Sequence, residues 1–294
     1  LDAAFGFNPV WVGVILTAVS LFVGFGGIKR VSKVSSVIVP IMAVGYLLLA
    51  LFVVAINITS LPDILGQIFS SAFGFRQFAG GSVGAALSLG IRRGLFSNEA
   101  GEGSAPNVAA TADVSHPVKQ GLIQALGVFT DTILICSCTA FIILCSGNYA
   151  SGDLTGIALT QSALESQIGS AGSIFVAAAI LFFAFSSIIG NAYYGEVNIR
   201  YLTDKKWVLA VYRLCSCGLV LMFGALASLD VVWSLGDLCM ALMTACNLVA
   251  IAFLGKYAFR LLDDYRNQKK SGIKDPVFKK STLPEISEDI ECWD

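Results

Sequence analysis

The sequence predicts an all-α polytopic membrane protein. Of its 294 residues, 56% are hydrophobic and only 13% are charged, and its mean hydropathy is +0.77. Soluble domains carry about 25% charged residues, and a folded chain of this size has too little interior to bury so many apolar side chains. Composition therefore excludes an ordinary soluble globule, a disordered chain and a nucleic-acid binder with a basic face. The lipid bilayer is the expected partner.

Seven apolar runs approach the length of about 20 residues that a helix needs to cross a bilayer. They cover 9–28, 37–57, 77–93, 118–147, 172–200, 207–227 and 231–254. Backbone amides find no water in hydrocarbon, so each run is expected to be a helix. Residues 1–254 are thus predicted to form a transmembrane domain, with a short surface helix over 60–76. Residues 255–294 are predicted to be a cytoplasmic tail, mobile from about Lys269.

Basic residues set the predicted orientation. When the first residue is placed outside, every Lys and Arg except Arg76 lies on or near the cytoplasmic side. Cytoplasmic loops of membrane proteins carry such an excess of positive charge. The C-terminus is therefore expected in the cytoplasm. An external first residue without a signal peptide also indicates a fragment of a longer chain.

The third span is short and rich in glycine. Its four glycines are Gly80, Gly81, Gly84 and Gly90. Short, glycine-interrupted spans mark transporter binding sites, where unwound backbone holds substrate or ion. Close helix packing through small residues is the alternative. The polar stretch 93–106 that follows is expected to be a structured inner loop, which acts as a gate or only connects.

Asp131 lies about halfway along the fourth span, near the expected midplane of the bilayer. An ionisable group at that depth is costly and is by default functional. Together with the Thr132 hydroxyl and freed carbonyls, its carboxylate suits a hard cation. The alternative is a structural carboxylate that accepts a hydrogen bond from Ser or Thr of a neighbouring helix.

Polar groups in the later spans also allow two interpretations. The hydroxyls of Ser186 and Ser187 either bond carbonyls of their own helix or supply oxygens to a sodium ion. Glu196 is expected to form a structural pair with Arg213. Trp233 either anchors the chain at the membrane interface or covers a pocket.

Several motifs resemble those of the alanine or glycine:cation symporter family. They are the run RGLFSNEAGEGSAP from Arg93 to Pro106, the segment HPVKQG from His116 to Gly121, Asp131-Thr132, Gly26–Arg30, Trp233–Asp237 and Asn247-Leu248. The resemblance covers nearly the whole chain. It implies sodium-driven uptake of alanine or glycine across the bacterial plasma membrane, with sodium as coupling ion and no cofactor. It also implies a leucine-transporter-type inverted-repeat fold, of which this chain supplies core spans four to ten.

The same resemblance implies roles for individual residues. Those implied to bind substrate are Phe78, Gly80, Gly81, Ser82 and Trp233. Those implied to bind sodium are Ser186, Ser187 and Phe183. Those that lie near a candidate second cation are Asp131 and Thr132.

Two other function classes stay open at this point. One is a seven-span receptor or structural membrane protein without transport activity, which the span count fits but the broken third span opposes. The other is a membrane enzyme. The sequence has one histidine, His116, no C-x-x-C motif and no evident nucleophile–base pair, so an enzyme is not expected.

Overall fold

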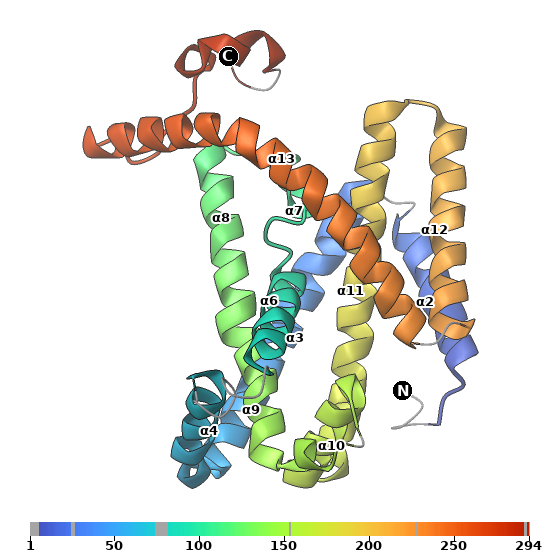
Figure 1. Cartoon of the computed structure of the whole chain (residues 1–294). Coiled ribbons are helices and arrows are strands. Elements are labelled where there is room, and N and C mark those ends of the chain that lie inside the picture. The colour runs from blue at the N-terminus through green and yellow to red at the C-terminus, as the bar shows by residue number, and fades with distance from the viewer. Residues whose placement is uncertain are drawn as a thin grey trace. The chain divides into compact units, whose positions relative to one another are not determined.

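A computed structural model describes residues 6–24, 27–73, 82–152, 154–226, 229–290 and 293 (Figure 1). Over these residues the chain is helical and has no strand, which confirms the all-α class. The chain divides into two compact units. The first comprises Leu1–Ser97 and Asp131–Val232, and the second comprises Asn98–Thr130 and Trp233–Asp294.

The first unit contains most of the long helices. Its described elements are α2 (Pro9–Gly24), α3 (Gly27–Ile56), η1 (Ile58–Ser60), α4 (Leu61–Phe73), α6 (Ser82–Asn98), the π-helix η2 (Thr130–Ile135), α9 (Cys136–Ser146), η3 (Asn148–Ser151), α10 (Gly156–Ile168), α11 (Ser170–Leu202) and α12 (Lys206–Leu226). Those of the second unit are α7 (Ala105–Ala109), α8 (Pro117–Phe129), α13 (Leu229–Lys270), η4 (Lys280–Thr282) and η5 (Pro284–Asp289). A short helix was expected over 60–76, and α4 forms a helix over Leu61–Phe73; residues 74–76 lie outside the described residues, and the location on the membrane surface stays a prediction.

Within the described part of the chain, five helices are long and apolar enough to cross a membrane. They are Arg30–Ile56, Pro117–Ser146, Ser170–Leu202, Lys206–Gly224 and Asp230–Lys270. The first predicted span corresponds to α2, which has 16 residues. The third corresponds to α6, whose described part begins at Ser82 and continues past the predicted end to Asn98. The count of seven spans and the inverted-repeat topology stay predictions.

Two helices extend well beyond their predicted spans. Helix α3 begins at Gly27, although its apolar run begins only at residue 37. Helix α13 continues past residue 254 to Lys270, over a stretch that contains several Lys, Arg and Leu residues. These residues favour helix whether or not lipid surrounds them. The change from apolar to polar residues therefore indicates where a helix would leave the membrane, but it does not indicate where the helix ends.

Two apolar clusters hold the first unit together. One joins Val53 of α3, Ile142 of α9, Leu164 of α10 and Val176 of α11. The hydroxyl groups of Tyr46 and Thr139 lie 2.8 Å apart and add a polar link between α3 and α9. Burial of apolar side chains supplies most of the stabilisation in such clusters, while the hydrogen bond satisfies two polar groups that lie among them.

The second cluster lies where α2, α3 and α11 meet, and it includes Val23, Val31, Phe185 and Ile189. It borders the hairpin of α11 and α12. In this hairpin Gly195 permits a close approach, because a Cβ atom there would collide with the Tyr212 hydroxyl.

Candidate functional site

Asp131 lies on the π-turn between α8 and α9. Its Oδ2 accepts a hydrogen bond of 2.6 Å from the hydroxyl of Ser97, near the end of α6. The Cys136 Sγ lies 3.1 Å from that hydroxyl and 4.0 Å from the same carboxylate oxygen. A π-turn widens the helix locally and is frequent at functional sites. A serine of another helix thus bonds the carboxylate, which is the arrangement expected of a structural Asp131.

The three residues assigned to sodium lie in the middle of α11. The Ser186 hydroxyl donates to the carbonyl oxygen of Phe183 at 2.9 Å. Ser187 is exposed on the surface of its unit, and its carbonyl accepts from the Asn191 side chain at 3.0 Å. Ser186 therefore forms the bond within its own helix that the structural interpretation expects. The same bond brings a hydroxyl oxygen and a carbonyl oxygen close together.

The substrate residues are only partly described. Phe78, Gly80 and Gly81 lie outside the described residues, and Ser82 is known as the first residue of α6. Trp233 is the first residue of the second unit's α13 segment, and its side chain is 38% exposed there. Thr132 follows Asp131 within the π-turn.

Glu196 is the centre of a buried charge cluster in the first unit. Its side chain is only 5% exposed. Arg213 of α12 donates from Nε to Oε2 at 2.9 Å and from Nη2 to Oε1 at 2.7 Å. Arg200, one turn along α11, donates from Nε and Nη2 to Oε1 at 3.0 and 2.9 Å. The predicted pair is confirmed, and Arg200 is a second partner that the sequence analysis missed.

In the second unit, the glycine-rich turn after α6 packs closely on α13. The Asn247 side chain donates to the Gly101 carbonyl at 2.9 Å. Gly103 has φ +98°, and a Cβ there would lie 2.9 Å from the Asn247 Cβ, so only glycine fits. Burial, with the negative charge of Glu99 nearby, raises the pKa of Glu102 in this turn. The expected structured loop is therefore present, and it begins after Asn98.

His116 is fully buried at the start of α8. Its Nδ1 accepts from the Val118 backbone amide at 3.2 Å and so caps the helix. Its Nε2 lies 3.2 Å from Asp264 Oδ2, so in the neutral ring the proton sits on Nε2 and is donated to Asp264. The rings of Tyr265 and Phe278 pack edge-on against the imidazole.

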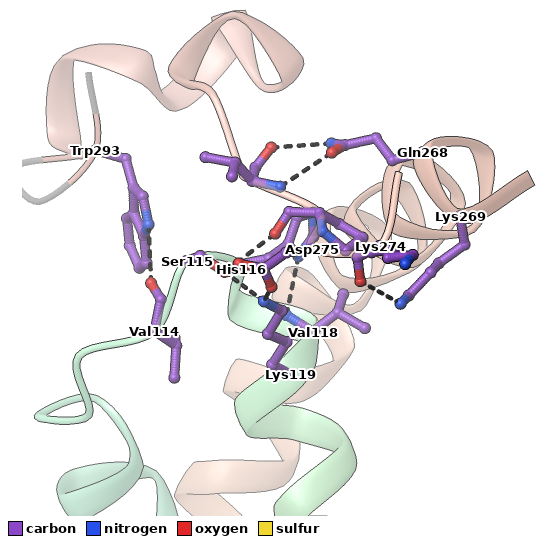
Figure 2. Close-up of polar contacts among 12 residues, drawn as sticks. Val114, Ser115, His116, Val118, Lys119, Gln268, Lys269, Lys274, Asp275 and Trp293 are labelled. Atoms are coloured by element: carbon purple, nitrogen blue, oxygen red, sulfur yellow. Dashed lines mark hydrogen bonds and ion pairs between the residues drawn. The ribbon is translucent and has the colours of Figure 1, made fainter. Parts of the chain in front are cut away.

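The C-terminal segment after α13 is folded against this histidine (Figure 2). Its Phe278 amide donates to the Ser115 carbonyl at 2.9 Å, and the Trp293 indole donates to the Val114 carbonyl at 3.3 Å. Asp275 pairs with Lys119, which lowers the pKa of the Asp275 carboxyl. The expectation of a mobile tail was wrong, because Phe278 and Leu283 are apolar anchors that are 3% and 2% exposed.

We expect His116→Ala to release this segment. The change removes a helix cap, the partner of Asp264 and a buried ring, which together cost roughly 2–3 kcal/mol. His116→Asn keeps an acceptor suited to the capping position and should release the segment less. Trypsin cleavage at Lys279 and Lys280 measures the release. Glu285→Gln is the control, since it breaks only the exposed pair with Arg260. Equal cleavage of His116→Ala and the unchanged chain would contradict this account.

A model of the sodium:alanine symporter family matches residues 1–280 of the chain. The chain belongs to this family. The family and its named members are transporters and not enzymes. The motifs that suggested the resemblance lie within the matched residues.

Three curated members of the family illustrate the similarity. The chain is 53% identical over 292 residues to the probable sodium/glutamine symporter GlnT of Bacillus subtilis, covering 99% of this chain and 60% of GlnT. It is 48% identical to the amino-acid carrier protein AlsT of the same organism, covering 100% and 62% of the two chains. It is 39% identical to the sodium/alanine symporter AgcS of Methanococcus maripaludis, covering 85% and 55%. The chain thus spans about three-fifths of the length of these relatives.

Within this family member, the structure assigns polar partners that sequence spacing did not indicate. Ser97 lies in the family-like run from Arg93 to Pro106, which was expected to be a loop. The first residues of that run, up to Asn98, instead form the end of α6. Because Ser97 lies on this helix end, its hydroxyl can reach the Asp131 carboxylate. The signal in the sequence was a hydroxyl residue about one helical turn beyond the predicted end of the third span at residue 93.

Proposed function

We propose that this chain forms the larger part of a secondary active transporter, which couples sodium influx to uptake of a small neutral amino acid. The match of the symporter family model to residues 1–280 carries the proposal. Five helices with the length and composition of membrane spans support it. The receptor and structural alternatives gain no support from this family. Uptake of a labelled amino acid under a sodium gradient tests the proposal.

Alanine is the substrate that the family description names, and glycine is the other substrate that the resemblance in sequence implies. Glutamine is a second candidate, because the relative that is 53% identical is named a probable sodium/glutamine symporter. Competition separates these candidates: unlabelled alanine, glycine and glutamine are compared for their ability to reduce labelled uptake at equal concentration. The true substrate reduces it most strongly.

We place the substrate near Phe78, Gly80, Gly81 and Ser82, with Trp233 closing over it. Residues 78, 80 and 81 come directly before the described part of α6, which runs from Ser82, and this order along the chain supports the placement. The N-terminus of a helix carries free amide groups and a partial positive charge, and both attract a carboxylate. An amino acid would therefore direct its carboxylate toward the first turn of α6.

We place the coupling sodium at Ser186, Ser187 and Phe183. The Ser186 hydroxyl oxygen and the Phe183 carbonyl oxygen lie 2.9 Å apart, as two oxygen ligands of one small cation can. A hydroxyl rotates easily, so Ser186 can turn its proton away and offer a lone pair. In this proposal sodium replaces the hydrogen bond that holds the two groups together in its absence.

We expect Ser187→Ala to weaken the activation of uptake by sodium about tenfold, because one oxygen ligand is lost. Maximal uptake at saturating sodium should change far less. Initial uptake rates over a series of sodium concentrations measure both quantities. Ser173→Ala, the same substitution in the same helix, serves as control. An unchanged sodium dependence in Ser187→Ala would remove this residue from the sodium site.

We propose Asp131 and Thr132 as part of a second cation site. The π-turn supports this role, since it frees backbone carbonyls from the regular hydrogen-bond pattern. A carboxylate, hydroxyls and freed carbonyls are ligands that hard cations prefer. Ser97 would then orient the Asp131 carboxylate before a cation binds. On binding, the cation would either replace the Ser97 hydroxyl at Oδ2 or contact the same oxygen beside it.

We further propose that the chain lies in the bacterial plasma membrane with seven spans, the inverted-repeat topology and a cytoplasmic C-terminus. The distribution of basic residues supports this orientation. The folded C-terminal segment at His116 would then lie on the cytoplasmic side. Accessibility of a single cysteine introduced at Lys274 to an impermeant reagent tests the orientation in intact cells.

A further inference from the structure

Four helices of the first unit surround a pocket that none of the proposed transport residues lines. Residues of α2, α3, α11 and α12 form its walls, which are largely apolar and include Leu21, Val31, Ile189 and Val220. The pocket encloses about 40 Å³ and is partly open to the surroundings. The enclosed part has room for only a short piece of hydrocarbon, so an acyl chain would enter it in part and continue along its open side.

One end of this pocket carries an excess of positive charge. Glu196 and Arg213 line it, and Arg200 binds the same carboxylate, so two guanidinium groups face one carboxylate. The Arg200 side chain is 56% exposed and lies at the open end of this cluster. Asp204, Lys205 and Lys206 follow within the next few residues and are all exposed, so the basic groups still outnumber the acidic ones here. An anion at this end would meet complementary charge.

The lining of the pocket also contains a buried hydroxyl group. Ser20 of α2 lines the pocket and is 6% exposed, and its Oγ has no hydrogen-bond partner among the described residues. Buried hydroxyls normally bond to protein or to a bound molecule. A ligand with an acceptor oxygen between its charged group and its apolar chain would satisfy Ser20.

We propose that this pocket binds one acyl chain of an anionic glycerophospholipid. Such a lipid presents, in order, a phosphate, an ester carbonyl and a hydrocarbon chain. The phosphate meets Arg200 and the neighbouring lysines, the ester carbonyl accepts from Ser20, and the chain lies along Val31 and Ile189. Each part of the lipid thus matches one part of the pocket, and the membrane itself supplies the ligand.

The test measures lipid binding to the purified chain in detergent by native mass spectrometry. Three probes separate the contributions: phosphatidylglycerol carries both charge and chains, phosphatidylcholine carries chains without net charge, and glycerol phosphate carries the charge alone. We expect phosphatidylglycerol to bind at least about tenfold more tightly than phosphatidylcholine, since each basic group near a membrane surface adds attraction. Glycerol phosphate should not bind measurably. Equal binding of the two lipids would overturn the proposal.

Variants then locate the binding. Ser20→Leu fills the pocket and should abolish the preference for phosphatidylglycerol, while Ser36→Leu on the exposed surface of α3 should keep it. The double variant Lys205→Gln and Lys206→Gln should lose the preference without loss of the fold. Full retention of the preference in a folded Ser20→Leu chain would place the lipid elsewhere.

Native cysteines give a readout that needs no variant. Cys217 lines the pocket, whereas Cys215, two residues away, lies on the exposed surface of α12. Bound phosphatidylglycerol should slow alkylation of Cys217 severalfold and leave Cys215 unchanged. If both cysteines react at the same rates with and without the lipid, the pocket is not its site. None of these measurements depends on transport activity.

Discussion

Replacing Glu196 with Gln lowers the melting temperature of the protein on the order of 10 °C, because a buried ion-pair partner is removed. Glutamine keeps the shape of the side chain and one acceptor, but it removes the negative charge that the guanidinium groups of Arg200 and Arg213 both contact. The Arg213 side chain is only 14% exposed, so water cannot replace the lost carboxylate. Loss of one partner of a buried pair costs about 3–5 kcal/mol. Thermal unfolding in detergent, followed by tryptophan fluorescence, measures the change.

Two further variants separate this charge effect from a general loss of packing. Glu285→Gln breaks the pair with Arg260, whose two side chains are about half exposed, and should shift the melting temperature little. Adding Arg213→Met to Glu196→Gln removes the buried positive charge that the lost carboxylate balanced, and should restore part of the lost stability. A melting temperature of Glu196→Gln equal to that of the unchanged chain would show that the cluster is not a structural centre.

Asp131→Asn should cause the largest loss of function among the variants of the proposed cation sites. Asparagine has nearly the same shape and can still accept from Ser97, but it lacks the negative charge that a cation requires. Loss of a charge-assisted interaction costs about 1.5–3 kcal/mol, which corresponds to roughly a 10- to 100-fold weaker cation affinity. Uptake measured over a range of sodium concentrations reports that change directly.

The melting temperature distinguishes a cation ligand from a structural carboxylate at this position. If Asp131 is a cation ligand, Asp131→Asn should weaken the activation of uptake by sodium and leave the melting temperature nearly unchanged. A structural role predicts lowered stability with unchanged sodium activation. Ser97→Ala, which keeps the charge, should have the smaller effect on uptake, and Asp63→Asn on the surface helix α4 provides a charge-matched control. Native-like sodium activation in Asp131→Asn would remove Asp131 from the coupling mechanism.

Where apolar runs end at polar residues on both sides, sequence alone predicted the helices closely. The fifth predicted span, 172–200, became α11 over Ser170–Leu202, and the sixth, 207–227, became α12 over Lys206–Leu226. Residues 203–205 between them cannot belong to either run. The pairing of Glu196 with Arg213 followed from the same hairpin, since a carboxylate in a membrane span needs a nearby cation.

Other features depend on contacts that no local pattern reveals. The extension of α13 to Lys270 follows from helix propensity in polar sequence, which a count of apolar residues ignores. The folding of the C-terminal segment depends on Phe278 and Trp293, two isolated aromatic residues in a polar stretch. Their side chains find partners there only because the segment before α8 supplies a backbone carbonyl to Trp293 and the His116 ring to Phe278. The bond from Ser97 to Asp131 likewise joins residues 34 positions apart.

Uptake of labelled alanine and glutamine into proteoliposomes tests the central claim most directly. The complete reading frame that contains this chain is reconstituted, and an inward sodium gradient is compared with an equal potassium gradient. We predict that at least one of the two amino acids accumulates above its external concentration with sodium, and that neither does with potassium. Dissipating the sodium gradient should release the accumulated amino acid. Equal accumulation under both gradients, or none under either, would contradict sodium-coupled transport of these amino acids.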